Sequence, residues 1–176
     1  MIHRASIVVL TLAVSACGYA LAGRGSSLPA HIKRIGVPMF ANHSDTTDLD
    51  RILTEAVRQE LQGRGGFVVV PDATGVDAVL TGEVQPIASM VAAFTDTTRQ
   101  ASKYLITIQA SVEFKDLVEG KVLVPNRVFR ASDDYEVTST ATGNNPAALF
   151  SQDQNALRRL AKTFAQSLVA QILENF

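Results

Sequence analysis

Residues 103–115, KYLITIQASVEFK, alternate between apolar and polar side chains. Successive side chains of a strand point to opposite faces, so the apolar ones would share one face of an extended chain. This pattern is typical of a strand that covers a hydrophobic core with one face and meets water with the other. We therefore expect a half-buried sheet around this strand. Its apolar face comprises Tyr104, Ile106, Ile108, Ala110, Val112 and Phe114.

The segments on either side of this strand predict further strands. The short turn DLVEG, residues 116–120, leads to a second extended run over residues 121–137, which Pro125 and Asn126 would bend or interrupt. A turn this short makes the two strands antiparallel. Earlier strands are expected at residues 31–40, at 67–70 and from 76 to about 84, with a continuation to Met90 left open.

Two segments carry apolar side chains at helical spacing. The first follows Thr47 or Asp48 as its N-cap and ends in the glycines of residues 63–66. The second begins at about Ser151 and includes Leu173. The order β-α-β-β-β-β-α predicts an α+β fold, with two amphipathic helices packed on one face of a mixed, mostly antiparallel sheet of four to five strands.

The composition limits the function before any motif is considered. The chain has 176 residues, of which 47% are apolar and 19% are charged, and this suits one folded domain. The 16 Lys and Arg residues are balanced by 17 Asp and Glu residues, so the net charge of -1 does not predict nucleic acid as a partner. A single cysteine excludes an internal disulfide framework and a zinc site built from several cysteines.

The N-terminal segment has the layout of a secretory signal. Arg4 precedes an apolar run, SIVVLTLAV at residues 6–14, and small residues follow it. A run of about ten apolar residues is too short to cross a bilayer as a permanent helix. An ordinary secretory signal and a buried strand are the alternatives, because Ile, Val and Leu are also good strand formers.

The four residues that end at Cys17, Val-Ser-Ala-Cys, resemble the lipobox of bacterial lipoproteins. The resemblance implies that the Cys17 thiol receives a diacylglyceryl group, that a signal peptidase cuts before Cys17, and that the new amino terminus is acylated. Several acyl chains on one residue anchor a protein firmly in a membrane. In the sorting rule of such lipoproteins, Gly18 after the cysteine favours the outer membrane. We expect a signal peptide over residues 1–16, a lipidated tether over 17–30 and a single α+β domain over 31–176.

No catalytic or cofactor motif accompanies these features. The sequence lacks G-x-S-x-G, H-E-x-x-H and Walker motifs, and the glycines of residues 63–66 follow a predicted helix instead of opening one. His31 and His43 flank the first predicted strand without a third partner, and the acidic residues lack the spacing of a calcium loop. We expect neither an enzyme nor a bound cofactor or metal.

Local groups of basic side chains are the remaining candidates for binding. Arg99 and Lys103 lie around the tip of the central hairpin, while Lys33 and Arg34 belong to the first predicted strand. Basic side chains at a hairpin tip or a strand end could meet lipid phosphates. The alternative for each of them is an ordinary charged surface.

Several segments, in their order along the chain, resemble the LPS-assembly lipoprotein family LptE. The similarity begins with the lipid-bearing Cys17 and the Gly-Tyr pair after it, and it continues through the first helix, LDRILTEAVRQEL at residues 49–61. It extends over the hairpin of residues 101–123 and the last helix, residues 155–176. Between these segments the matching positions are Leu28, Pro29, Ile32, Ile35, Val37, Pro38, Phe40, Asn42, Asp77, Ala78, Leu80 and Gly82.

The resemblance implies a sheet with two helices on it and a role without catalysis. Members of this family sit as a plug inside the LPS-assembly β-barrel LptD, help that barrel to fold and assist the delivery of LPS to the outer leaflet. LPS binding in the family is attributed to basic residues near strand and loop positions, and Arg99 and Lys103 are the candidates here from their charge and location. The alternative function is a generic outer-membrane lipoprotein that binds or scaffolds another envelope protein.

Overall fold

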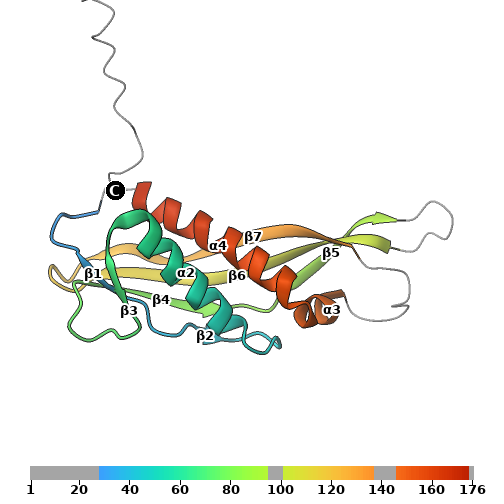
Figure 1. Cartoon of the computed structure of the whole chain (residues 1–176), viewed down its shortest axis with the longest axis horizontal. Helices are drawn as coiled ribbons and strands as arrows, with labels where there is room; N and C mark the ends of the chain where they lie inside the picture. Colours follow the sequence, from blue (N-terminus) through green and yellow to red (C-terminus); the bar gives the residue numbers. More distant parts are fainter. Residues whose placement is uncertain (1–27, 95–100, 137–145, 175–176) are drawn as a thin grey trace, which may run out of the picture.

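The structure, a computed structural model, describes residues 28–94, 101–136 and 146–174. It has two layers, a sheet and two long helices that lie across one face of the sheet (Figure 1). A third, short helix precedes the last one. The strands are β1 (Arg34–Gly36), β2 (Ala41–Asn42), β3 (Val68–Val70), β4 (Ala78–Val84), β5 (Ala88–Phe94), β6 (Ala101–Asp116) and β7 (Val122–Glu136), and the helices are α2 (Leu49–Gly65), α3 (Pro146–Gln152) and α4 (Gln154–Glu174).

The long strand β6 lies at the centre of the sheet. One of its edges pairs with β7, and its other edge pairs with β4 and, further along, with β5; all three pairings are antiparallel. On the far side of β4 the sheet becomes parallel, because β4 pairs with β1 and β2, and β1 pairs with β3. Helix α2 connects β2 to β3 and so forms the crossover that parallel neighbours require.

The α+β class, the mixed sheet and the packing of the long helices on one face are confirmed. The predicted strand number is wrong, because seven strands form one sheet in the described residues instead of four or five. The sheet is also not mostly antiparallel, since three of the six strand pairings just named are parallel. The extra strands are β2, which follows directly after the predicted strand of residues 31–40, and β5, which Pro86, with no N–H for a ladder, separates from β4. The predicted strand of residues 31–40 itself contains only the short β1.

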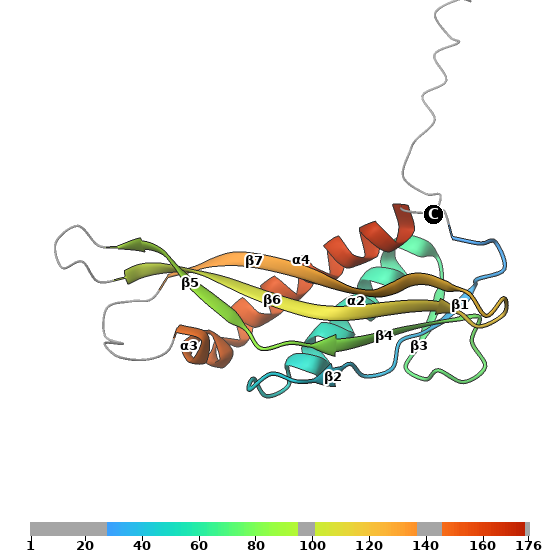
Figure 2. The same ribbon diagram turned by 180° about the vertical axis from the view of Figure 1, so that it is seen from behind.

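The core lies between the sheet and the two long helices. The side chains of β6 that were predicted to be apolar and to share one face point into it, and those from Ile106 to Phe114 are at most 1% exposed. The apolar stripe of α2 meets them from above, with Leu49, Leu53 and Val57 fully buried. Seen from behind, the sheet covers both helices, so one of its faces is left open (Figure 2). The buried face of α4 comprises Ala156, Leu157, Leu160, Ala161, Phe164, Ala165, Leu168, Val169 and Ile172.

The helix ends follow from local backbone chemistry. Asp48 precedes α2 as predicted, but its side chain makes no capping hydrogen bond; it adopts a left-handed conformation, and its carboxylate lies 3.6 Å from Arg51. Gly66 ends α2 with φ at 64°, a conformation that glycine adopts without steric cost. The predicted single helix from Ser151 is divided, because the Asp153 carboxylate accepts hydrogen bonds from the N–H groups of Asn155 and Ala156 and so caps the start of α4.

The irregular link between β1 and β2 is held by α2. The Arg58 guanidinium donates two hydrogen bonds to the Val37 carbonyl, at 2.9 and 2.6 Å. The buried Thr54 hydroxyl accepts a hydrogen bond from the Phe40 N–H at 3.0 Å. These contacts turn the Phe40 ring onto β4 at Gly82, where the absence of a side chain leaves room for the ring. Backbone groups that have no strand partner are thus satisfied by helix side chains.

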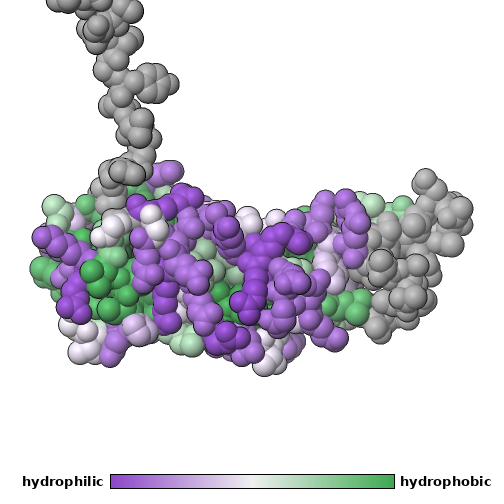
Figure 3. All heavy atoms as spheres, viewed as in Figure 1, coloured by the Kyte–Doolittle hydropathy of each residue, from purple (hydrophilic) through white to green (hydrophobic). Residues whose placement is uncertain are grey.

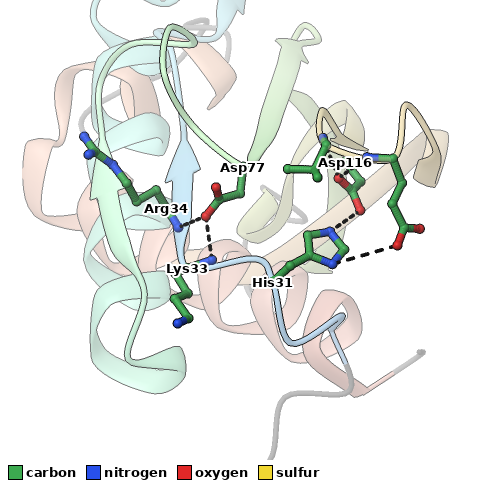
Figure 4. Close-up of polar contacts among 7 residues, drawn as sticks. His31, Lys33, Arg34, Asp77 and Asp116 are labelled. Carbon is green, nitrogen blue, oxygen red and sulfur yellow. Dashed lines mark hydrogen bonds and ion pairs between the residues drawn. The ribbon is translucent and has the colours of Figure 1, made fainter.

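Two aspartates fasten the first described residues to the sheet (Figure 4). The Asp77 carboxylate accepts hydrogen bonds from the N–H groups of Lys33 and Arg34, both at 2.8 Å. The fully buried Asp116 carboxylate accepts a hydrogen bond from His31 at 2.7 Å when His31 carries its proton on Nε2. The other oxygen of Asp116 accepts the N–H groups of the turn after β6, at 2.8 and 3.1 Å.

We expect Gly82→Ala to destabilise the fold. A Cβ at this position would lie 2.8 Å from ring atoms of Phe40, a residue that is 2% exposed and whose N–H is bound to Thr54. The free energy of unfolding, measured by urea denaturation, should fall by about 1–3 kcal/mol, as is usual for overpacking. The matched control is Gly63→Ala, where no atom lies within 4 Å of the added Cβ; the helix should then be unchanged or stabilised by up to about 1 kcal/mol. Equal effects of the two substitutions would contradict the close contact.

We expect the Asp116 carboxyl to make stability depend on pH. Burial raises the pKa of this carboxyl group. The hydrogen bonds from Glu119, His31 and Val118 together lower the pKa by more than burial raises it, so it lies below the ordinary value of 3.8. Such a group stabilises the fold above its ordinary pKa, and this stability is lost as the pH falls through the folded-state pKa. The urea midpoint should therefore drop below about pH 4, and it should drop less steeply in Asp116→Asn. Parallel pH profiles for the two proteins would contradict this role of Asp116.

Candidate functional site

Of the predicted lipidation site and the two predicted LPS contacts, the structure describes only Lys103. Cys17, the predicted lipidation site, and Arg99, a predicted LPS contact, lie outside the described residues. Lys103 lies on β6, opposite Glu136 of β7 and near the end of the hairpin. Its side chain belongs to the open face of the sheet, because successive side chains of a strand alternate between the two faces. Lys103 is an even number of residues away from the polar positions of β6 and an odd number away from the buried ones.

Lys103 is not an isolated cation. Its Nζ lies 3.5 Å from the Asp134 carboxylate and 3.6 Å from the Glu136 carboxylate, and all three side chains are at least 36% exposed. With one positive and two negative charges, the group carries a net charge of -1. At this exposure each pair contributes little to stability, because water and salt screen it. The two carboxylates therefore reduce the attraction of Lys103 for an anion without fixing it in the fold.

Exposed apolar side chains surround this charged group. We use the term arm for the outer part of the sheet formed by β5 and the strand residues 101–107 and 132–136, which extends beyond the helices (Figures 1 and 2). On β5 the exposed fractions are 69% for Met90, 42% for Val91 and 63% for Phe94. The sequence analysis did not identify these side chains as candidates. The signal was the run ASMVAAF, which is apolar on both faces and therefore cannot be buried on both faces at a sheet edge.

The open face of the sheet is polar along most of its length. Thr107 and Ser132 share a hydrogen bond of 2.8 Å across β6 and β7, and the Arg130 guanidinium donates to the Gln109 amide oxygen at 3.2 Å. These pairs stand on neighbouring strands and face away from the helices. They offer hydrogen-bonding groups to water or to another polar surface. The face also contains a groove of about 360 Å³ lined by Pro38, Met39, Ala41, Thr81, Gly82, Glu83, Ser111, Glu113 and Asn126.

A second polar cluster resembles a metal site in composition but is already satisfied by hydrogen bonds. His31, Asp116 and Glu119 bring one ligand atom each within 4.8 Å of one another. The Asp116 carboxylate, however, accepts hydrogen bonds on both oxygens, and His31 lies 3.9 Å from Glu119 through its second nitrogen. This cluster stabilises the turn after β6, and the structure gives no reason to assign it a metal. His43, the other histidine considered, lies 4.0 Å from Glu83.

None of the helices in the described part of the chain combines the length and the apolar character that a membrane span needs. The long helices instead are amphipathic, with their polar faces directed to water. A groove of about 350 Å³ lies between them, lined by Ile52, Glu55, Ala56, Gln59, Glu60, Arg158, Ala161 and Lys162. Its charges are of both signs, so it does not select a ligand of one charge.

The fold is found in other bacterial proteins with little sequence similarity. The structure matches lipoprotein B of Nitrosomonas europaea with a TM-score of 0.54 at 12% identity, over 89% of this chain and 90% of that one. It matches the hypothetical protein CT253 of Chlamydia trachomatis with a TM-score of 0.51 at 12% identity, over 80% and 95% of the two chains. For protein XCC0632 of Xanthomonas campestris the TM-score is 0.50 at 16% identity, over 86% and 91%. These similarities support the fold and say nothing about a ligand.

Comparison of the sequence with protein families identifies the family directly. No curated protein sequence shows significant similarity to the chain. The model of the lipopolysaccharide-assembly family, LptE, matches residues 32–172, which include every described strand and both long helices almost to the end of α4. This range contains most of the positions on which the sequence resemblance rested. The chain belongs to the lipopolysaccharide-assembly family LptE.

Proposed function

We propose that the protein is an outer-membrane lipoprotein that acts, without catalysis, as the plug and assembly subunit of the LPS-export β-barrel LptD. The observation that carries this proposal is the match to the LPS-assembly family over residues 32–172. In this role the protein supports folding of the barrel and the insertion of LPS into the outer leaflet. It needs surfaces that fit a barrel and a lipid, and it needs no catalytic group or cofactor.

The open face of the sheet supports the plug role. The lumen of a large outer-membrane barrel is polar and contains water. A hydrogen-bonding surface such as the one around Thr107, Gln109, Arg130 and Ser132 can exchange its water for the polar groups of a lumen wall. An apolar surface of the same size would leave the polar groups of the lumen wall without hydrogen-bond partners. The helices keep the apolar core of the protein away from that environment.

The anchor is proposed at Cys17, with residues 17–30 as the tether. Leu28, near the end of this tether, is 7% exposed and already belongs to the core, so the chain is held by the fold from Leu28 onward. Acyl chains on Cys17 would keep the domain at the membrane, and Gly18 after it favours the outer membrane. The tether is rich in glycine and serine, which suits a flexible connection.

The arm is the proposed contact with LPS. Arg99 and Lys103 supply positive charge for phosphate groups, while Met90 and Phe94 on β5, the strand paired with that of Lys103, supply exposed apolar surface for acyl chains. An amphiphile that carries both kinds of group would meet both on this arm. The carboxylates of Asp134 and Glu136 weaken the attraction and make binding sensitive to the local charge.

Purification of the full-length protein from membranes in mild detergent tests the assembly role. We expect a large β-barrel to be recovered with it in a fixed ratio, because a plug buries a large, hydrogen-bonded surface in the lumen. Depletion of the protein should also lower the amount of LPS at the cell surface. Recovery of the protein as a monomer, together with normal surface LPS after depletion, would favour a generic lipoprotein and reject the barrel role.

Charge substitutions on the arm test the LPS contact. Lys103→Gln and Arg99→Gln should each weaken LPS binding by about fivefold at low salt, since one basic side chain near an anionic lipid surface contributes about 1 kcal/mol. Removal of the opposing charges in Asp134→Asn/Glu136→Gln should strengthen binding, and high salt should reduce all these differences. Lys162→Gln on the exposed face of α4 is the control for loss of a lysine. Binding curves that do not differ between the arm variants and this control reject Arg99 and Lys103 as contacts.

A further inference from the structure

The turn between β6 and β7 exposes aliphatic side chains where a surface turn usually carries polar ones. The exposed fractions are 41% for Leu117, 64% for Val118 and 43% for Val122. Gly120, with φ at 66°, supplies the left-handed conformation that closes the turn. Turn chemistry therefore accounts for the glycine and leaves the three aliphatic side chains without an explanation. We call Leu117, Val118 and Val122 the turn patch.

The turn patch lies at the end of the molecule where the described chain begins. His31 binds Asp116, the last residue of β6, and the Leu117 N–H donates to the Asp77 carbonyl at 2.8 Å. Asp77 in turn holds the N–H groups of Lys33 and Arg34 (Figure 4). Both ribbon views place the turn and the first described residues together, at the end opposite the arm (Figures 1 and 2). Hydrophobic side chains are also visible at this end, whereas hydrophilic ones cover the helices (Figure 3).

Basic side chains occur in the turn and on the neighbouring segment: Lys121 belongs to the turn, while the side chains of Lys33 and Arg34 point away from Asp116 (Figure 4). Lys33, Arg34 and Lys121 are exposed. None of them forms an ion pair with another residue in the described ranges. The carboxylates of Asp77 and Asp116 are turned inward, onto backbone N–H groups and His31. Glu119, in the turn itself, is 57% exposed, so the corner carries three exposed basic side chains and one exposed carboxylate beside the aliphatic surface, and its charge stays positive.

We propose that the turn patch is a membrane contact, with Leu117, Val118 and Val122 at the level of the lipid headgroups and the basic side chains on the phosphates of anionic phospholipids. Aliphatic side chains bordered by Lys and Arg are the combination that binds to such a surface. Three side chains are far too few for a stable protein interface, which buries about 1,200 Å² or more in total. They are enough for a membrane contact if another part of the chain already holds the protein there.

The proposed anchor at Cys17 provides that second attachment, and the inference rests on this part of the proposed function. Residues 17–27 can span at most about 40 Å, the fully extended length of eleven residues. The point where the chain joins the fold, at Leu28, therefore stays close to the bilayer whatever path the tether takes. Because the turn patch lies at this point, it meets the lipid surface at a high effective concentration.

Site-specific fluorescence on the full-length, acylated protein tests the contact. If Cys17 is acylated, Val118→Cys introduces the one reactive thiol, which can carry an environment-sensitive dye. In vesicles of phosphatidylethanolamine and phosphatidylglycerol, a quencher on the lipid headgroup region should reduce this fluorescence at least about twofold more than it does for Val128→Cys. Val128 is the matched control because it is an exposed valine, 41% accessible, that lies opposite Ser111 on the open face of the sheet, outside both the turn patch and the arm. Val122→Cys should behave like Val118→Cys.

The outcomes separate the two proposals. If mass spectrometry shows Cys17 without acyl chains and the protein does not remain on vesicles, the proposed anchor fails. If the acylated protein remains on vesicles but both turn variants are quenched no more than Val128→Cys, the anchor stands and the membrane contact is overturned. The membrane contact is also overturned if the dye at position 118 or 122 is shielded from water in whole envelopes but not in vesicles. That result would indicate a protein partner. Vesicles of phosphatidylcholine alone should lower the quenching, since they lack the anionic headgroups; unchanged quenching would overturn the role of the basic side chains.

Discussion

The alternation of apolar and polar residues along β6 is the constraint on which the rest of the structure depends. This strand has β7 on one edge and β4 and β5 on the other, so its register sets theirs. Its buried face meets α2 and α4, and its other face forms the centre of the open, polar surface. A slip of one residue would exchange these two faces in every strand that pairs with it. Both the core and the proposed lumen-facing surface are therefore determined by one period-two pattern.

Elements with long, regular patterns could be predicted from the sequence, whereas those fixed by distant contacts could not. β6 and α2 repeat their pattern often enough to define their type and most of their length, and β7 follows from the short turn after β6. The short strands β1 and β3 lie inside segments that were predicted as strands, but their parallel pairing could not be predicted, because it depends on contacts far along the chain, such as Asp77 with the backbone of Lys33 and Arg34. The division of the last helix was missed because Asp153 acts as a cap only where the chain turns, which the apolar spacing does not show.

The family resemblance identified the fold better than the site because its residues have structural tasks. Gly82 makes room for the Phe40 ring, and Asp77 holds the backbone ahead of β1. Leu28 and Leu80 are buried in the core. Such positions show that a chain belongs to the family without showing what it touches. Lys103 could be chosen from its charge, but its two acidic neighbours appear only once the register places Glu136 opposite it.

The distribution of exposed apolar groups adds an argument that net charge cannot supply. The chain is nearly neutral, and its candidate LPS-binding lysine lies beside two carboxylates, so long-range attraction to an anionic lipid is weak. Exposed aliphatic and aromatic side chains nevertheless gather at both ends of the molecule, around Met90 and Phe94 on the arm and around Val118 at the turn. The sheet face between the ends is mostly polar, with Met39 and Val128 as exposed apolar side chains. Since apolar surface gains free energy when it leaves water, two apolar ends joined by a polar body suit a protein that meets acyl chains at each end and a water-filled lumen between them.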